Sequence, residues 1–170
     1  MATTIIREAR LEDATAIAVI YNAAMGDGAA NYETRLHDGD ERRAWLARLV
    51  EQGYPVMVGT VAESVVGFGA LTPFHIVSGY RFTVSGSLYV AKDYRAQGVG
   101  RLLGGALLEA ARSRAYHTIV AGINSANSAS IRLLETFGFT QVGYFKEIGH
   151  RDGRWYDDVC LQLILDSQLK

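Results

Sequence analysis

The chain has 170 residues, of which 49% are hydrophobic and 21% charged, and its formal net charge is −1. This length and composition are typical of one globular domain with a substantial core, so we expect a single domain over residues 1–170. The near-neutral charge argues against nucleic acid or a membrane surface as a partner, and no apolar run approaches the roughly 20 residues of a membrane span.

The spacing of apolar residues predicts strands and helices in the order β-α-α-β-β-β-α-β-α-β-β. The predicted strands are 5–7, 55–62, 65–72, 80–90, 118–123, 141–148 and 156–165. The predicted helices are 13–25, 41–51, 99–114 and 128–137. Residues 26–31 are expected to form a loop and residues 150–153 a turn. This order implies an α/β fold in which helices cover both faces of one mixed sheet.

Residues 86–103 are the most informative segment, because an apolar strand end runs into a basic loop that opens a helix. The first turn of a helix has unpaired N–H groups and a partial positive charge. Gly98 and Gly100 lack a Cβ, so a phosphate can approach their backbone closely. Arg95 and Arg101 add positive charge. The segment therefore predicts a site for a phosphorylated ligand, and specifically for a pyrophosphate.

Three phosphate-binding loops compete for this segment. A P-loop needs Lys and then Ser or Thr after its second glycine, but Arg and Leu follow Gly100. A dinucleotide fingerprint has a spacing that Gly98, Gly100 and Gly104 do not match. The spacing Arg-x-x-Gly-x-Gly, which starts at Arg95, resembles the pyrophosphate loop of the GNAT acetyltransferase superfamily. That superfamily binds acetyl-coenzyme A (acetyl-CoA). A glycine-rich turn that only caps a helix is the alternative.

A second block, residues 127–139, resembles the other signature of the same superfamily, Asn-x-x-Ser/Ala-x-x-Leu followed by Gly-Phe. The resemblance gives Asn127 and Ser130 roles as coenzyme A contacts. Asn127 is equally well placed to be the N-cap of a helix. Both roles can hold, because a cap at a helix terminus also faces the ligand cleft.

The resemblance implies the GNAT fold, in which the strands over 80–90 and 118–123 lie side by side and then splay apart. The pantetheine arm of the coenzyme would pair with the strand backbone that the splay leaves free. The coenzyme contacts implied by the resemblance are Leu88, Tyr89, Val90, Arg95, Ala96, Gln97, Gly98, Val99, Gly100, Arg101, Asn127 and Ser130.

Further blocks, at residues 20–22, 32–34, 80–84, 87–90 and 153–157, resemble the phosphinothricin and methionine sulfoximine N-acetyltransferases. The acceptor contacts expected on this basis are Tyr32, Glu33, Phe74, His75, Tyr80 and Arg81. A Glu33 carboxylate beside the cleft would hold an ammonium group, or it is a solvated loop acid. Arg81 is a carboxylate anchor or a surface charge.

The chain departs from this group at three positions that matter for chemistry. Ser85 stands where the group has a Glu that is taken as the general base, and a serine hydroxyl cannot take a proton from an ammonium near neutral pH. Leu134 stands where a His or Tyr acid is usual. An Arg expected before Tyr80 is replaced within residues 74–78.

These departures leave the acid and base unassigned. Ser85 can still hold a water molecule at the usual base position. Glu33 and His75 are the candidates for a substitute base. Tyr89 and Tyr144 carry phenols that could protonate the leaving thiolate. We therefore take Glu33, Ser85 and Tyr89 as the catalytic candidates.

The expected function is N-acetylation of a primary amine on a small molecule, such as an amino acid or an analogue, by direct attack on acetyl-CoA in a ternary complex. The alternatives are a non-catalytic acyl-CoA sensor or partner subunit, and an acetyltransferase that acts on peptides. Relatives of this type are commonly homodimers, so we expect a homodimer. Tyr21, Tyr32, Trp155 and Tyr156 would suit its interface or, equally, a core.

The cysteine and histidine content adds two expectations. Cys160 is the single cysteine, so it can form no internal disulfide. Together with a first segment that lacks the layout of a signal peptide, this favours a reducing cytoplasm. The four histidines are scattered and no His/Cys group has zinc-ligand spacing, so we expect no metal.

Overall fold

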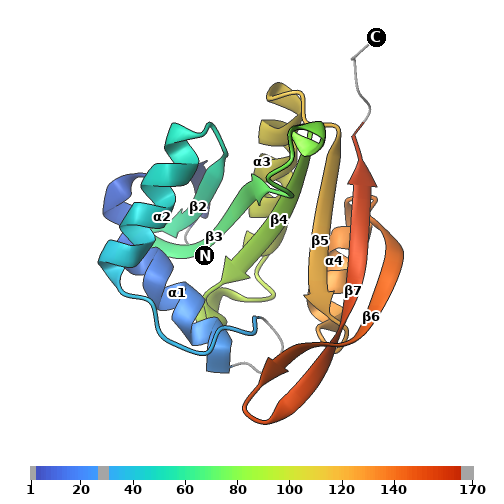
Figure 1. The fold of residues 1–170 in the computed structure, drawn as a ribbon. Helices are drawn as coiled ribbons and strands as arrows, with labels where there is room; N and C mark the ends of the chain where they lie inside the picture. The colour runs from blue at the N-terminus through green and yellow to red at the C-terminus, as the bar shows by residue number, and fades with distance from the viewer. Residues whose placement is uncertain (1–2, 27–30, 166–170) are drawn as a thin grey trace.

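The computed structural model of the protein describes residues 3–26 and 31–165, and within them the chain folds around one seven-stranded sheet (Figure 1). The strands are β1 (Ile5–Glu8), β2 (Val56–Val61), β3 (Ser64–Pro73), β4 (Thr83–Val90), β5 (Thr118–Asn124), β6 (Thr140–Arg151) and β7 (Arg154–Ile164). The helices are α1 (Ala14–Gly26), α2 (Gly39–Glu51), α3 (Val99–Ser113) and α4 (Ser128–Thr136). The predicted order of elements and the α/β class are confirmed. The predicted loop over 26–31 starts one residue too early, because Gly26 is the last residue of α1, and residues 27–30 lie outside the described residues.

The strand order is β1-β2-β3-β4-β5-β7-β6, and the sheet is mixed because β4 and β5 run parallel while the other neighbours are antiparallel. The parallel pair is short. Thr83, Val84 and Ser85 pair with the start of β5, and no pairing with β5 is recorded beyond Ser85. Figure 1 shows the two strands diverging from there. The predicted splay is confirmed.

The helices form two layers, one on each face of the sheet (Figure 1). On one face, α1 and α2 bury Ile17 and Leu46 against Phe68 of β3. On the other face, Leu103 of α3 packs in a second core cluster with Val84 of β4. Because successive side chains of a strand point to opposite faces, β2, β3 and β4 contribute to both cores. Burial of a large aliphatic side chain is worth about 1.5–3 kcal/mol, so both layers stabilise the sheet.

The start of β4 differs from the prediction, which began this strand at Tyr80. Residues Ser78–Tyr80 form a 3₁₀ turn instead. The N–H of Tyr80 donates to the carbonyl of Val77 (3.0 Å), and the N–H of Arg81 donates to that of Ser78 (3.2 Å). These amides are therefore used inside the turn, and the strand begins at Thr83.

The turn between β6 and β7 is shorter than the predicted 150–153. Arg151 belongs to β6 and pairs with Arg154 of β7. The turn is the dipeptide Asp152-Gly153, with φ of 51° and 74°. Positive φ at both residues is the backbone of a type I′ hairpin turn, whose twist matches the strands on either side. Both strands are therefore longer than the sequence pattern indicated.

Candidate functional site

A cleft of about 710 Å³ lies where β4 and β5 separate. Its wall is built from β4, the loop into α3, β5 and the start of α4. The predicted coenzyme residues that line it are Leu88, Tyr89, Val90, Arg95, Ala96, Gly98, Gly100, Arg101, Asn127 and Ser130. Strand β4, the loop into α3 and the loop into α4 therefore meet at one site, although the last of them lies far from the others in the sequence.

Gln97 and Val99 are the two predicted coenzyme residues that lie outside this wall. The Nε2 of Gln97 donates to the carbonyl of Asp93 at 2.7 Å, which folds the side chain back on its own loop. Val99 is buried, and a methyl group of its side chain faces Gly59 and Gly67 in the core. Only the backbone of Val99 is available to a ligand.

The loop into α3 has the backbone expected of an anion site. Ala96 has φ of 57° and Gly98, the N-cap of α3, has φ of 87°. The N–H of Leu102 donates to the carbonyl of Gly98, which closes the first turn of the helix. The first-turn N–H groups before Leu102 have no earlier helical carbonyl to bind. That turn contains no acidic residue, and Arg101 lies on the cleft wall. The combination favours a negatively charged group.

Gly100 lies at a close approach between α3 and its neighbours. A Cβ at this position would lie 3.2 Å from a methyl group of Leu133 in α4 and 3.6 Å from one of Leu88 in β4. Gly100 therefore lets the backbone of α3 come close to both walls of the cleft. A larger side chain here would push into the space between them.

The two roles that the sequence left open for Asn127 are compatible. Its Oδ1 accepts a hydrogen bond from the N–H of Ser130 at 3.2 Å, so Asn127 caps α4, and both residues line the cleft. Leu134, one turn further along α4, also lines the cleft. A leucine at this position offers no proton to a leaving group.

The side of the sheet that carries α1 contains a second set of cleft residues. Val84 packs on the α3 side, so Ser87 and Tyr89 point to the α1 side by the alternation of a strand, and both line the cleft. The Tyr89 ring stacks on Phe68 with ring centres 5.1 Å apart. Burial raises the pKa of Tyr89 to about 12, so its phenol is protonated at neutral pH and can donate a hydrogen bond. The cleft wall reaches Ala24 of α1 on this side.

Ser85 and Glu33, both predicted as catalytic, lie outside the cleft wall. Ser85 is the last residue of β4 that pairs with β5. The Oε2 of Glu33 lies 2.7 Å from Nε2 of His37. The hydrogen bond with His37 holds the pKa of Glu33 below its usual value. Glu33 therefore has a protein partner for its charge.

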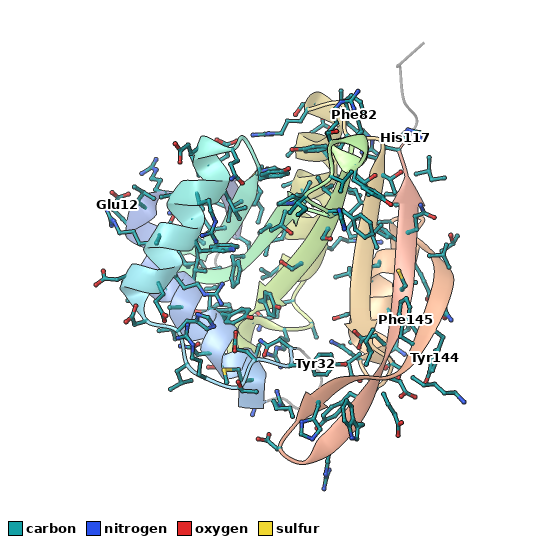
Figure 2. All side chains as sticks on the ribbon, in the orientation of Figure 1. Glu12, Tyr32, Phe82, His117, Tyr144 and Phe145 are labelled. Carbon is teal, nitrogen blue, oxygen red and sulfur yellow. The ribbon has the colours of Figure 1, made fainter. Side chains whose placement is uncertain are left out.

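The predicted acceptor residues Phe74, His75, Tyr80 and Arg81 also lie outside the wall and gather on one another. The Tyr80 ring centre lies 5.6 Å from that of Phe74 and 5.1 Å from that of His75. The Arg81 guanidinium lies 4.5 Å above the ring of Phe82. This group sits at the end of the sheet where β4 and β5 are paired, marked by Phe82 and His117 in Figure 2. The structure separates these residues from the cleft.

Tyr32 also lies outside the cleft wall, but at the open end of the splay rather than at the paired end. Figure 2 shows it between the end of α1 and the β6–β7 hairpin, whereas Tyr144 lies on the outer side of that hairpin. The Tyr32 hydroxyl donates to Oδ1 of Asp158, and the hydroxyl of Tyr144 donates to Oδ2 of Asp157 at 2.6 Å. The sequence reasoning missed Asp158. The signal available in the sequence was that Asp158 is a charged residue within the apolar alternation of the last strand.

The described residues offer neither a metal-ligand cluster nor a membrane-spanning helix. In residues 3–26 and 31–165, no group of three or more His, Cys, Asp and Glu side chains is arranged to hold a metal ion. No helix in that part of the chain is both long and apolar enough to cross a membrane.

The sequence and the fold match known proteins over nearly their whole length. Residues 6–160 match the family model described as acetyltransferase (GNAT) domain. The chain is 38% identical to the L-amino acid N-acyltransferase MnaT of Escherichia coli (strain K12), over 96% of this chain and 95% of that protein. It is 39% identical to the L-methionine sulfoximine/L-methionine sulfone acetyltransferase of Salmonella typhimurium, over 95% of both. An acetyltransferase structure from Salmonella typhimurium with its cofactor acetyl-CoA has a TM-score of 0.93 and 38% identity, covering 98% and 96% of the two chains.

Proposed function

Because this chain belongs to the GNAT acetyltransferase family, we propose that it transfers the acetyl group of acetyl-CoA to the primary amine of an amino acid or an amino-acid analogue. The chain is an N-acetyltransferase, and two of its relatives are named for amino acids or amino-acid analogues as acceptors. The observation that carries the proposal is the cleft between the splayed strands, which joins an anion site to free strand backbone.

The coenzyme half of the cleft fits acetyl-CoA. The first-turn N–H groups of α3, with Arg101 beside them, would bind the pyrophosphate. The part of β4 from Gly86 to Val90 runs beyond the pairing with β5, so backbone groups there are available to the pantetheine arm. A strand N–H in this stretch would hydrogen-bond the thioester oxygen and stabilise the negative charge that develops on it.

Transfer is direct, from the thioester to the amine, in a ternary complex. Cys160 is the one cysteine of the chain, and it lies outside the cleft wall. Burial raises the pKa of its thiol, which lowers the fraction of reactive thiolate. We therefore assign no covalent intermediate to it. The acceptor would approach from the α1 side of the sheet, where Ser87 and Tyr89 point.

The test is steady-state release of the free coenzyme A thiol from acetyl-CoA. Free amino acids, methionine sulfoximine and polyamines serve as acceptors, and a short peptide with a free N-terminus as a further one. Release that depends on a free amino acid or its analogue supports the proposal. Release with the peptide alone would establish a peptide acceptor instead. Tight binding of acetyl-CoA without release on any acceptor would identify a sensor.

We also propose a cytoplasmic homodimer. Trp155 of the β6–β7 hairpin is 61% exposed, as an interface residue would be in an isolated chain, whereas Tyr21 packs against the ring of Tyr89 at 5.2 Å. Trp155 thus fits an interface and Tyr21 a core. Light scattering at micromolar concentration would give twice the mass of one chain, and the mass of one chain would refute the dimer.

A further inference from the structure

Asp158 of β7 lies just behind the cleft wall on the acceptor side, because its neighbours across the sheet, and not Asp158 itself, line the cleft. In the sheet, Asp158 lies directly opposite Asn124 of β5, and Cys160 lies opposite Gly122. Paired residues and those two positions away share one face, so the Asp158 side chain lies on the same face as Gly122 and Asn124. Both of these line the cleft. A Cβ at Gly122 would lie 3.7 Å from Oδ2 of Asp158, so the absence of a side chain there leaves the carboxylate close to the cleft.

The two oxygens of Asp158 have different surroundings. Oδ1 accepts the hydroxyl of Tyr32, which lies 126 residues earlier in the chain. The Tyr32 ring is fixed in turn, because it packs against Tyr156 with ring centres 5.5 Å apart and lies directly over Gly149. No hydrogen bond or ion pair to Oδ2 is recorded within the described residues. One oxygen is held by the protein, and the other is available to a ligand.

An independent observation at the same place points to a ligand. Asn124 is 6% exposed, and its buried Nδ2 makes no hydrogen bond of good geometry among the described residues, although its side chain interacts with the nearby Tyr32 hydroxyl. Its Oδ1 accepts from the N–H of Ala126 at 2.8 Å, which fixes the orientation of the amide. A buried donor without a partner costs roughly 1–3 kcal/mol, so such groups call for an explanation. An oxygen of a bound acceptor would satisfy this one.

We propose that Asp158 binds the ammonium group of the acceptor through Oδ2 and takes its proton, that Tyr32 holds the carboxylate in place, and that Asn124 donates to an oxygen beside the amine. The inference rests on the proposed function and names the residues that perform its acceptor half. It also fits the acceptor class, because an amino acid carries an ammonium and carboxylate oxygens one carbon apart.

The other candidates for the base are less suited to this step. The Glu33 carboxylate is bound to His37, and Leu134 has no titratable group. The Ser85 hydroxyl cannot hold a proton taken from an ammonium.

The groups around Asp158 are Tyr32 from the loop before α2, Tyr156 and Asp157 from β7, Asn124 from β5 and Phe145 from β6. Asp157 is engaged by Tyr144 and by the N–H of Glu147 (2.8 Å), and neighbours in a strand point to opposite faces.

The step balances as follows. The acceptor ammonium gives one proton to Oδ2 of Asp158, which frees the lone pair of its nitrogen. The nitrogen attacks the carbonyl carbon of the thioester, the carbon–nitrogen bond forms, and the carbon–sulfur bond breaks with its electron pair on sulfur. A second proton of the nitrogen passes to that sulfur. The products are the N-acetylated acceptor and the coenzyme A thiol, and Asp158 returns its proton to solvent.

The test compares Asp158→Asn with Asp157→Asn, the same change one residue away on the other face. We expect Asp158→Asn to lower kcat/KM for the acceptor by roughly 10²–10⁴-fold, the usual contribution of general acid–base catalysis. The Kd of acetyl-CoA should stay at the wild-type value, and Asp158→Glu should restore part of the rate. Asp157→Asn should stay near the wild type.

The outcomes separate the two proposals. A wild type that binds acetyl-CoA but acetylates no amine would refute the proposed function. A wild type that acetylates amino acids, with Asp158→Asn equal to it across the pH range, would refute the role of Asp158. Should Asp158→Asn fail to fold by circular dichroism, Tyr32→Phe carries the test, since it removes only a hydroxyl. We expect Tyr32→Phe to raise the acceptor KM about tenfold with the acetyl-CoA Kd unchanged, and an unchanged acceptor KM would overturn the proposal.

Discussion

Gly104 of α3 lies against the ring of Phe137 at the end of α4, and a Cβ at Gly104 would lie 2.5 Å from Cε2 of that ring. Both residues line the cleft, so this contact sets how closely the two helices approach behind it. Gly105, the next residue, has open space where its Cβ would be. Neighbouring glycines in one helix therefore have different reasons to be glycine.

Alanine at these two positions should have opposite effects on stability. Gly104→Ala forces the Phe137 ring to move, and overpacking of this kind costs about 1–3 kcal/mol. Gly105→Ala only removes the poor helix propensity of glycine, which should stabilise by roughly 0.5–1 kcal/mol. Urea unfolding of both variants measures the difference. Equal free energies of unfolding would contradict the packing seen at Gly104.

Glutamate at Gly100 should abolish binding of acetyl-CoA. The side chain would enter the gap between Leu133 and Leu88 and add negative charge to the anion site. Gly105→Glu is the matched control, because it places the same charge on the same helix outside the cleft wall. Calorimetric titration with acetyl-CoA checks both. An unchanged Kd in Gly100→Glu would show that the coenzyme binds elsewhere.

Substitutions at Asn127 should separate its cap from its contact with the coenzyme. Asn127→Ala removes the hydrogen bond to the N–H of Ser130 and should cost about 1 kcal/mol of stability. Asn127→Asp keeps a capping oxygen, so its stability should stay near the wild type, while its charge repels a phosphate. Thermal melts together with acetyl-CoA titrations make the comparison. Wild-type coenzyme affinity in Asn127→Asp would remove Asn127 from the binding site.

The ion pair between Arg7 and Asp13 should make stability depend on pH in the acid range. The Asp13 side chain is 8% exposed, and Nη1 of Arg7 lies 2.7 Å from its Oδ2. Burial raises the pKa of Asp13, but the hydrogen bonds from Arg7 and from the N–H of Arg10 outweigh it, so the pKa lies below its usual value. A carboxyl whose pKa is lowered by folding stabilises the fold above its unfolded pKa of about 3.9, and that stability is lost as the pH falls through the lower, folded pKa.

We therefore expect Asp13→Asn to lower the free energy of unfolding at pH 7 by about 1–3 kcal/mol. The difference in free energy of unfolding between Asp13→Asn and the wild type should disappear as the pH falls below about 4. Urea unfolding between pH 2.5 and 7 measures it. Glu12→Gln is the control, since Glu12 is exposed on the outer edge of the molecule (Figure 2). A constant gap across that range would mean that the ion pair is not the cause.

The parts of the molecule that sequence reasoning predicted are those with local signals. Strand alternation and helix periodicity can be read from a few neighbouring residues, and they predicted the order of the elements. The Gly98–Gly100 loop is equally local, and it predicted the residues that gather at the anion site. The start of β4 was wrong because Tyr80 and Phe82 are good strand formers, while hydrogen bonds inside the turn at Ser78 decide the backbone.

The acceptor side could not be predicted in the same way. Alternation alone places Asp158 on one face of β7, but it does not show that Tyr32 returns to that face from 126 residues away. Glu33 was a reasonable candidate as a loop acid, and its partner His37 lies four residues further on in a segment without helical periodicity. Contacts of this kind depend on how distant loops dock, which no short pattern records.

The short parallel pairing of β4 with β5 divides the sheet into two units. Strands β1 to β4 form one antiparallel unit and β5, β7 and β6 form another, and each is a continuous stretch of the chain. Their cooperativity in unfolding therefore depends on a narrow row of hydrogen bonds and on helix packing across it. A molecule bound in the cleft bridges the two units and shifts the equilibrium against their separate opening. We therefore expect the occupied protein to open as one cooperative unit, and in the empty protein we expect the amides of β4 that face β5 beyond Ser85 to be among the first to exchange with solvent.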